Sequence, residues 1–159
     1  MQSNRLEDWG PPLWRILHTL AERLGRQTIP LLATDERRAW INFLRSIEGA
    51  MPCAKCRAHY RAWRLKNPVE KFIGAYDLKE AAREWLWTLH TEVNTERNVT
   101  GPSLAEIPAL YGSRTGYEIQ DDINIFLELL KTATLQRTVT GDATRTFRKT
   151  LELLRRISG

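Results

Sequence analysis

The spacing of apolar residues limits most strongly what this chain can fold into. In residues 9–25, apolar side chains recur every three or four positions, which places them on one face of a helix. The same spacing recurs in the segments 34–48, 53–65, 78–96, 103–111, 121–136 and 142–157. No alternation of polar and apolar residues is long enough to indicate a strand. The sequence therefore predicts an all-α fold.

Helix-breaking residues divide the chain further. Asn67-Pro68 ends the helix that begins near residue 53, because a residue before proline is disfavoured in helical conformation. A loop bracketed by Gly112 and Gly116 is the best internal boundary. The sequence thus predicts a first unit, residues 1–111, with four long helices and one short one. Residues 112–159 are then a C-terminal extension of two helices with a packing or interaction role.

The only two cysteines of the chain, Cys53 and Cys56, lie three positions apart. On a helix this spacing places both sulfurs on one face, close enough to form a disulfide. Pro52 suits a first helical turn, so Cys53 is expected where the helix dipole stabilises an anion. Basic residues follow with no acid among them: Lys55, Arg57, Arg61, Arg64 and Lys66. A helix start and nearby cations favour the reactive thiolate, so this stretch predicts a redox-active dithiol with Cys53 and Cys56 as its catalytic residues.

Three other interpretations of the cysteine pair stay open at this point. The two residues can be buried apolar side chains, because a free cysteine packs like a small hydrophobe. They can be half of a zinc site that two of His18, His59 and His90 complete, although the usual second Cys-x-x-Cys or His-x-x-x-His is missing. A thioredoxin-type motif is the third alternative, but it needs a preceding strand, which this sequence lacks.

Two of the predicted helices carry a second stripe of residues beside the apolar one. Trp14 and His18 lie four positions apart in the first helix. In the helix over 78–96, the stripe along one edge consists of Leu86, His90, Val93, Asn94 and Arg97. Aromatic rings near histidine and cysteine are what a pocket for an aromatic ligand would use. The simpler alternatives are a satisfied core histidine and a solvated helix end.

Charge and hydropathy exclude several classes of protein. The net charge of the 159 residues is +5, a mild excess that does not by itself imply nucleic acid. Residues 1–8 are polar, so we expect no signal peptide, and no apolar run approaches the length of a membrane span. Two cysteines are too few for a disulfide-stapled secreted scaffold. We therefore expect a soluble protein made in the cytoplasm, without a nucleic-acid partner and without a membrane span.

Three segments together resemble the Erv/ALR family of FAD-linked sulfhydryl oxidases. Residues 10–21 (GPPLWRILHTLA) resemble the opening helix of that family, in which a Gly is followed by a Trp and then by Leu-His-Thr. Residues 53–60 resemble the active-site dithiol, most closely in the form seen in members encoded by large DNA viruses. Residues 85–94 (WLWTLHTEVN) resemble the Trp-Leu-x-x-Leu-His-Asn-x-Val-Asn helix. The order and rough spacing also agree, over residues 9–111.

The resemblance implies a fold, a cofactor and a set of site residues. The fold is an Erv/ALR-like helical bundle of four long helices and one short one that holds FAD near its end. The implied cofactor-binding residues are Gly10, Trp14 and His18 from the first helix and His90, Val93, Asn94 and Arg97 from the fourth. The family further implies a homodimer, a protein dithiol as substrate, oxygen as the second partner, and no metal ligand.

The chain departs from the family pattern at several positions. Thr91 replaces the Asn that follows the histidine of the fourth helix. A longer segment replaces the Leu-Gly-Lys-Pro after Val-Asn, so Arg97 or Arg114 has to take the place of the lost Lys. Glu22 and Arg23 stand where a tyrosine is expected. No second cysteine pair is present, so the chain has no shuttle disulfide of its own.

The resemblance also implies a mechanism. A partner thiolate would attack the disulfide at Cys53, and Cys56 would pass two electrons to FAD and on to oxygen, giving hydrogen peroxide. His59, one turn from Cys56, either tunes that thiol or is a surface histidine. Without a shuttle pair, the substrate reaches the dithiol directly or through a partner such as a thioredoxin-like shuttle.

Other functions fit parts of the sequence. A catalytically weak or inactive Erv-like structural or interaction protein, such as a virion component, is an alternative because the Lys and the shuttle cysteines are missing. A zinc-binding module is another. For the extension, a helical hairpin packed on the bundle or at a dimer interface competes with a basic amphipathic surface for membrane or nucleic acid. The viral resemblance implies a cytoplasmic location, in a viral factory or in a virion.

Overall fold

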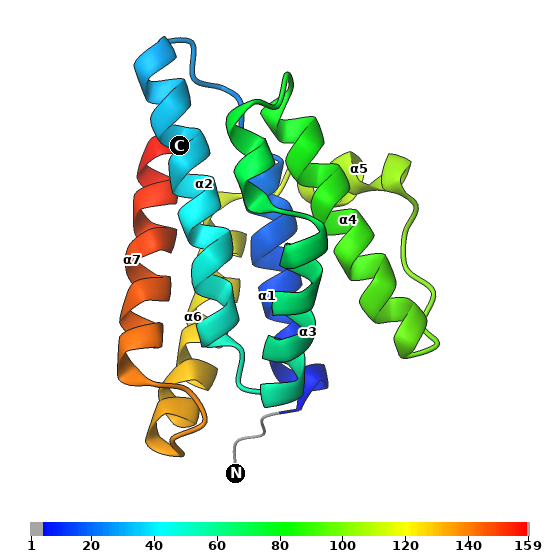
Figure 1. The fold of residues 1–159 in the computed structure, drawn as a ribbon, viewed down its shortest axis with the longest axis vertical. Coiled ribbons are helices and arrows are strands. Elements are labelled where there is room, and N and C mark those ends of the chain that lie inside the picture. The colour runs from blue at the N-terminus through cyan, green and yellow to red at the C-terminus, as the bar shows by residue number, and fades with distance from the viewer. Residues whose placement is uncertain (1–4, 159) are drawn as a thin grey trace.

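The computed structural model describes residues 5–158, and within them every regular element is helical (Figure 1). The all-α prediction is therefore confirmed. The elements in chain order are α1 (Leu6–Ala21), α2 (Pro30–Ala50), α3 (Ala54–Lys66), the 3-10 helix η1 (Val69–Ile73), α4 (Leu78–Glu96), the 3-10 helix η2 (Leu104–Glu106), α5 (Ile107–Tyr111), α6 (Gly116–Leu135) and α7 (Gly141–Ser158). Four long helices and a short one are followed by two more long helices, as the sequence predicted.

Capping explains two helix starts that lie earlier than predicted. α2 begins at Pro30 rather than at Thr34, because proline is well tolerated in the first turn, where its missing N–H needs no partner. α6 begins at Gly116 rather than at Asp121. The side chain of Thr115 accepts a hydrogen bond from the Glu118 N–H, and the Glu118 carboxylate accepts one from the Thr115 N–H. This reciprocal pair satisfies two donors that a helix start otherwise leaves free.

The first helix ends four residues earlier than predicted. α1 stops at Ala21, and Gly25 adopts a φ of +79° in the loop that follows. Glycine reaches this left-handed region without the cost that a Cβ brings, so the chain can turn here toward α2. The Gly25 N–H donates to the buried carboxylate of Glu36 at 3.0 Å, which ties the turn to α2.

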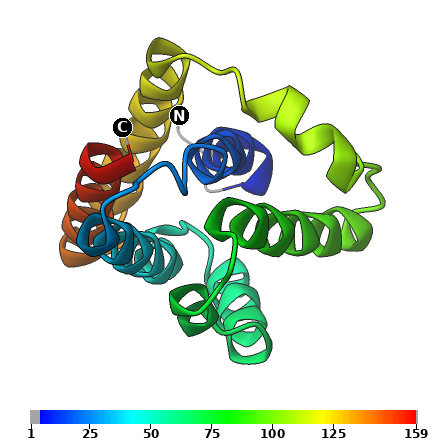
Figure 2. The same cartoon turned by 90° about the horizontal axis from the view of Figure 1, so that it is seen from above.

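α1 lies in the middle of the bundle, with the other helices arranged around it (Figure 2). α6 packs on one side of α1, and α4 and α5 pack on others, while α2 packs against α7, α3 and η1. The rings of Phe43 in α2, Phe126 in α6 and Phe147 in α7 are in contact, with centroids 5.6 and 5.2 Å from that of Phe147. The extension thus shares buried contacts with the rest, and the division at residue 111 stays a prediction.

Buried ion pairs connect α1 to its neighbours. The Glu22 carboxylate, just after α1, accepts two hydrogen bonds of 2.8 Å from Arg83 of α4. In the sequence, Glu22 stands where the family pattern expects a tyrosine. On the other side of α1, Asp122 of α6 accepts from Arg15 at 2.7 Å and from Arg114 at 2.6 Å. Because both carboxylates are buried, each depends on its arginine partners for compensation of its charge.

In residues 5–158, no helix combines the length and the apolar character that crossing a membrane requires. The prediction that the chain has no signal peptide concerns residues 1–4 in part, and these lie outside the described residues.

Candidate active site

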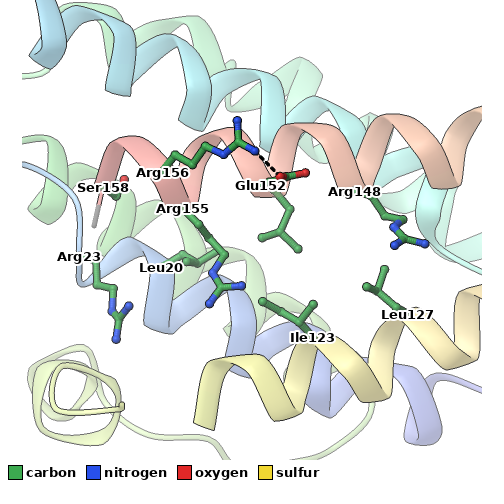
Figure 3. Close-up of a pocket in the computed structure, with 10 residues that line it drawn as sticks. Leu20, Arg23, Ile123, Leu127, Arg148, Glu152, Arg155, Arg156 and Ser158 are labelled. Carbon is green, nitrogen blue, oxygen red and sulfur yellow. Dashed lines mark hydrogen bonds and ion pairs between the residues drawn. The ribbon is translucent and has the colours of Figure 1, made fainter. Parts of the chain in front are cut away.

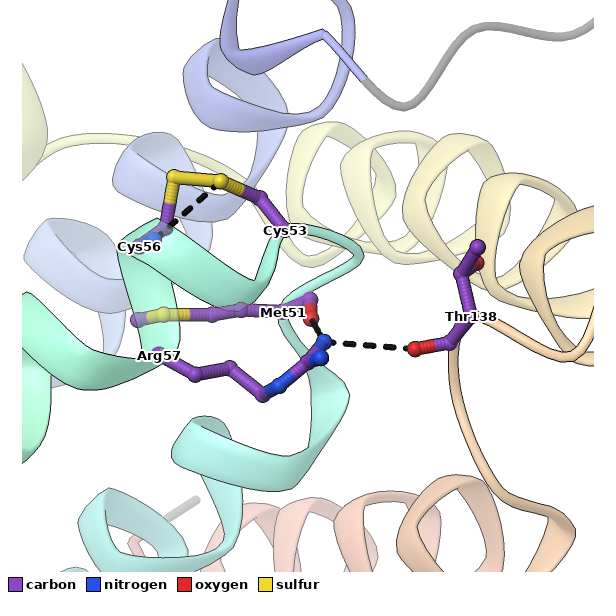
Figure 4. The surroundings of a disulfide bond; sticks show 5 residues. All are labelled: Met51, Cys53, Cys56, Arg57 and Thr138. Atoms are coloured by element: carbon purple, nitrogen blue, oxygen red, sulfur yellow. Dashed lines mark hydrogen bonds between the residues drawn. A yellow bond between two sulfur atoms is a disulfide. The ribbon is translucent and has the colours of Figure 1, made fainter.

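The two cysteines are joined as a disulfide at the start of α3 (Figure 4). Cys53 is the N-cap of α3, and its sulfur accepts a hydrogen bond of 3.1 Å from the backbone N–H of Cys56. The backbone N–H groups of a helix start carry partial positive charge. When the pair is reduced, the same N–H therefore stabilises a thiolate on Cys53 better than the neutral thiol.

Fewer cations face the dithiol than the sequence led us to expect. Arg61 and Arg64 both form ion pairs with Glu48 at the end of α2, so an acid from another helix neutralises them. Arg57 instead donates to the backbone carbonyls of Met51 and of Thr138, the latter at 3.2 Å (Figure 4). Arg57 thus fixes the α3 start against the preceding loop and against the α6–α7 loop.

A cavity of about 340 Å³ lies between α1, α3 and α4, with α2 at its back. Cys56 is part of its wall, whereas Cys53 is not. The rings of Trp9, Trp14 and Trp85 supply aromatic wall, and leucines from α1, α2 and α4 supply most of the remainder. The volume is in the usual range for sites that take small molecules or cofactors. Of the two disulfide-bonded cysteines, only Cys56 therefore lines this mostly apolar, aromatic chamber, and both are partly buried against the core.

The structure brings together some of the predicted cofactor-binding residues and separates others. Gly10, Trp14, Val93 and Arg97 line the cavity with Cys56. Three of the predicted residues lie outside its lining: His18, His90 and Asn94. Asn94 belongs to the end of α4, where its carbonyl accepts a hydrogen bond of 2.8 Å from the Val99 N–H.

The two histidines form a ring stack behind the cavity wall. Trp14 lies nearly parallel to His90, with ring centroids 3.9 Å apart, and His18 stacks on Tyr111 of α5 at 4.7 Å. His18 Nε2 and His90 Nδ1 share a hydrogen bond of 3.0 Å. Burial, with a smaller contribution from His90, lowers the pKa of His18 to about 3, and burial lowers the pKa of His90 to about 4. Both rings are therefore neutral at physiological pH.

His59 lies at the mouth of the cavity rather than on an open surface. It lines the cavity together with Cys56 and Glu96. Its Nε2 lies 2.8 Å from the Glu92 carboxylate and 3.6 Å from that of Glu96, so it connects α3 to α4. Arg97 is at the same mouth and lies 3.8 Å from Glu7 of α1. The entrance thus carries both signs of charge around an apolar interior.

Sequence reasoning missed several wall residues. Trp9 lines the cavity because α1 begins at Leu6, one turn before the predicted start. Leu13, Leu17 and Trp85 also line it, although their periodicity indicates ordinary core. The spacing of Trp9, Leu13 and Leu17 at four-residue intervals was the available signal, but it cannot distinguish a filled core from a cavity wall.

Two of the other interpretations of the cysteine pair, the zinc site and the thioredoxin-type motif, find no supporting feature in residues 5–158, whereas both cysteines do pack against the core. Within residues 5–158, no three His, Cys, Asp or Glu side chains are grouped so that they could hold a metal ion. His59 is engaged with two glutamates, and His18 with His90. The element before α3 is a helix, so the strand that a thioredoxin-type motif follows is absent from this part of the described chain.

Comparison with known proteins points to one family. Residues 11–104 match the Erv1 / Alr family. Protein 088R of Frog virus 3 (isolate Goorha) is 29% identical over 108 residues, which cover 67% of this chain and 68% of that protein. A protein named FAD-linked sulfhydryl oxidase, from the Malawi tick isolate of African swine fever virus, is 31% identical over 104 residues, covering 65% of this chain and 79% of its own. No solved structure gives a significant match. Because the matched segment spans more than half of the chain and contains the cysteine pair, α3 and α4, the chain belongs to the Erv1 / Alr family.

Proposed function

We propose that this protein is an FAD-linked thiol oxidase that forms disulfides in partner proteins through Cys53 and Cys56. One observation carries the proposal. In the disulfide at the α3 start, Cys56 belongs to the lining of an aromatic cavity and Cys53 does not. This arrangement separates a sulfur for the partner from a sulfur for a cofactor. The name of the African swine fever virus relative supports the same activity.

The residues present fit a flavin. The cavity is lined by flat rings and leucines, as the apolar faces of an isoalloxazine require, and it reaches Cys56. Arg97 and Lys55 at its edge supply positive charge for a diphosphate. His18 Nδ1, behind the cavity wall, is buried and has no hydrogen-bond partner among the described residues. Gly10, Trp14, Val93 and Arg97 would hold the group directly, and His18, His90 and Asn94 would support it from behind.

The chemistry of the chain itself is thiol–disulfide exchange. A partner thiolate attacks the sulfur of Cys53, the Cys53–Cys56 bond breaks, and Cys56 leaves as a thiolate. The second thiol of the partner then attacks the mixed disulfide, which releases the partner oxidised and leaves Cys53 and Cys56 reduced. The Cys56 N–H stabilises the Cys53 thiolate that forms. FAD, when bound, supplies the two-electron acceptor that restores the disulfide and delivers the electrons to oxygen as hydrogen peroxide.

The partner has to approach the Cys53 side of the disulfide. The chain contains no other cysteine that could serve as a shuttle. The substrate is therefore a protein dithiol that reaches Cys53 itself, or a thioredoxin-like protein that carries the oxidising equivalents onward. The homodimer, and a location in the cytoplasm, a viral factory or a virion, belong to the same proposal.

The test replaces each cysteine with serine. Cys53→Ser and Cys56→Ser should each abolish oxygen consumption with dithiothreitol, because exchange needs both sulfurs, while the purified proteins stay yellow with bound FAD. The measurements are an oxygen electrode trace and the flavin absorbance spectrum. Normal peroxide output from either variant would refute the dithiol assignment. A yellow wild-type protein that consumes no oxygen with any dithiol would instead favour the structural-protein alternative.

A further inference from the structure

A groove runs between α6 and α7 on the part of the molecule that the oxidase reaction does not use. α6 packs along α1 and α7 packs along α2, so the two helices meet each other only weakly. Two hollows of about 480 and 630 Å³ lie between them and are adjacent, since Leu127 and Arg148 line both; we call the two together the groove. Leu20, Ile123 and Leu151 lie at the bottom of the first hollow and are buried, whereas Leu127 is half-buried and Leu135 of the second hollow is exposed.

The walls of the groove are strongly basic (Figure 3). The first hollow is lined by four arginines, Arg23, Arg148, Arg155 and Arg156, and its only acid among the described residues is Glu152. Glu152 is already paired with Arg156 at 2.5 Å. The second hollow adds Lys131 and Arg145, of which Arg145 is paired with Asp142, and the acid in its described lining is Glu128. Positive charge therefore exceeds negative charge along the whole groove.

Several of these arginines lack an anionic partner. Arg155 donates to the neutral amide oxygen of Gln120 at 2.7 Å, and Arg23 donates to a backbone carbonyl at 3.0 Å. Arg148 forms no ion pair within residues 5–158. Burial, and then repulsion from Arg26 and Arg155, lower the pKa of Arg23. An anion placed here would relieve this repulsion, so the groove attracts negative charge.

The shape of the groove favours a polypeptide segment over a compact anion. It is lined from Ser158 to Gly141, the two ends of α7, and a helix of these 18 residues is roughly 27 Å long at about 1.5 Å per residue. An apolar floor with charged walls is the pattern that receives an amphipathic helix. The apolar face of α7 is already buried against α2, with Phe147 and Leu154 fully covered, so α7 has no free face for membrane insertion.

The groove ends near the dithiol. Thr134 and Gly141 line its far end and flank the α6–α7 loop. The Thr138 carbonyl of that loop accepts the hydrogen bond from Arg57, four residues after Cys53. A segment that lies in the groove therefore ends next to the loop that Arg57 joins to the start of α3.

We propose that the groove between α6 and α7 docks an acidic amphipathic segment of the protein dithiol substrate. The identification of the partner as the substrate rests on the proposed oxidase function, whereas the docking of an acidic segment does not. Apolar residues of the segment contact Leu127 and Leu135, and its carboxylates pair with Arg148, Arg155 and their neighbours. Docking raises the effective concentration of the thiol at Cys53.

The probe is a synthetic helical peptide with Leu and Glu at core and flanking positions, joined to a Cys-x-x-Cys dithiol. Its control carries Lys in place of every Glu. We expect Arg148→Glu to raise the KM for the acidic peptide about threefold, and Arg148→Glu with Arg155→Glu about tenfold, since each exposed ion pair contributes about 0.2–1 kcal/mol. Lys149→Glu is the matched control, because Lys149 is exposed on the same helix but lines neither hollow. Dithiothreitol, which has no segment to dock, should keep its KM in all variants.

A second measurement separates the docking from the oxidase reaction. The dissociation constant of a fluorescent Cys→Ser form of the acidic peptide should rise by the same factors in the arginine variants, even if no dithiol is ever oxidised. Equal loss of binding in Lys149→Glu, or equal affinity for the Glu and Lys peptides, would overturn the proposal. So would Arg148-dependent binding of single-stranded DNA or phosphatidylserine vesicles by a protein that ignores the acidic peptide.

Discussion

His18 and His90 determine how the protein responds to mild acid. Both rings are held neutral behind the cavity wall, with pKa values of about 3 and about 4 in the folded state. In the unfolded chain each takes a proton near pH 6.5. Between pH 6.5 and about 4 the unfolded state therefore binds more protons than the native state, so stability is present above that window and is lost as the pH falls.

We predict that lowering the pH from 7 to 5 reduces the free energy of unfolding by up to about 2 kcal/mol for each of the two histidines. His90→Gln keeps a hydrogen-bonding side chain beside His18 but does not titrate, so its slope with pH should be about half that of the wild type. Urea unfolding at a series of pH values measures both slopes. Between pH 7.5 and 8.5, the free energy of unfolding should change equally with pH in the wild type and in His90→Gln. Equal slopes below pH 6.5 would contradict the prediction that His90 is kept neutral in the folded state.

Sequence reasoning was most successful for residues whose chemistry is local. The spacing of Cys53 and Cys56 is a property of one helix, and the structure shows them bonded at its start. The pairing of Arg61 and Arg64 with Glu48 could not be predicted, because it depends on how α2 and α3 meet. The same limit applies to His18 and His90, which are 72 positions apart in sequence but share a hydrogen bond.

At the scale of elements, Phe147 is the residue through which α7 contacts both α2 and α6. Phe147 is fully buried, and its ring touches Phe43 of α2 and Phe126 of α6. We predict that Phe147→Ala lowers the free energy of unfolding by about 3–5 kcal/mol, because it leaves a cavity where three helices meet. Urea denaturation followed by circular dichroism measures the loss.

The control for this change lies on the same helix. Leu153 is 47% exposed, so Leu153→Ala should alter stability by no more than about 0.5 kcal/mol. If the two alanine variants were equally stable, α7 would not be anchored through Phe147.

Element boundaries show which signals the periodicity of apolar residues leaves out. The capping box of Thr115 and Glu118 is a sequence signal that marks the start of α6. Periodicity missed this start because the first apolar repeat begins later. Pro30 likewise marks the start of α2. The periodicity of apolar residues predicted the number and order of the long helices. It could not predict the cavity walls, because the same stripe of leucines is found in a filled core and in the wall of a ligand site.

In the whole molecule, one side of α1 lines the cavity and another side contacts the extension. Trp14 and Leu17 face the cavity that ends at Cys56, and Arg15 and Leu20 face the extension. The carboxylate of Asp122 in α6 joins Arg15 of the first unit to Arg114, which lies in the predicted extension. Removing the extension would expose the apolar sides of α1 and α2 and leave Arg15 without its partner.

We therefore predict that the chain unfolds as one cooperative unit. All six tryptophans lie between residues 9 and 87, so their fluorescence reports on the first unit alone, whereas circular dichroism also reports on the 20 residues of α6 and the 18 of α7. Because the buried rings of Phe126 and Phe147 belong to the same core as Phe43, both signals should change with the same urea midpoint. A transition at lower urea concentration that only circular dichroism detects would show that residues 112–159 unfold first, as a separate unit.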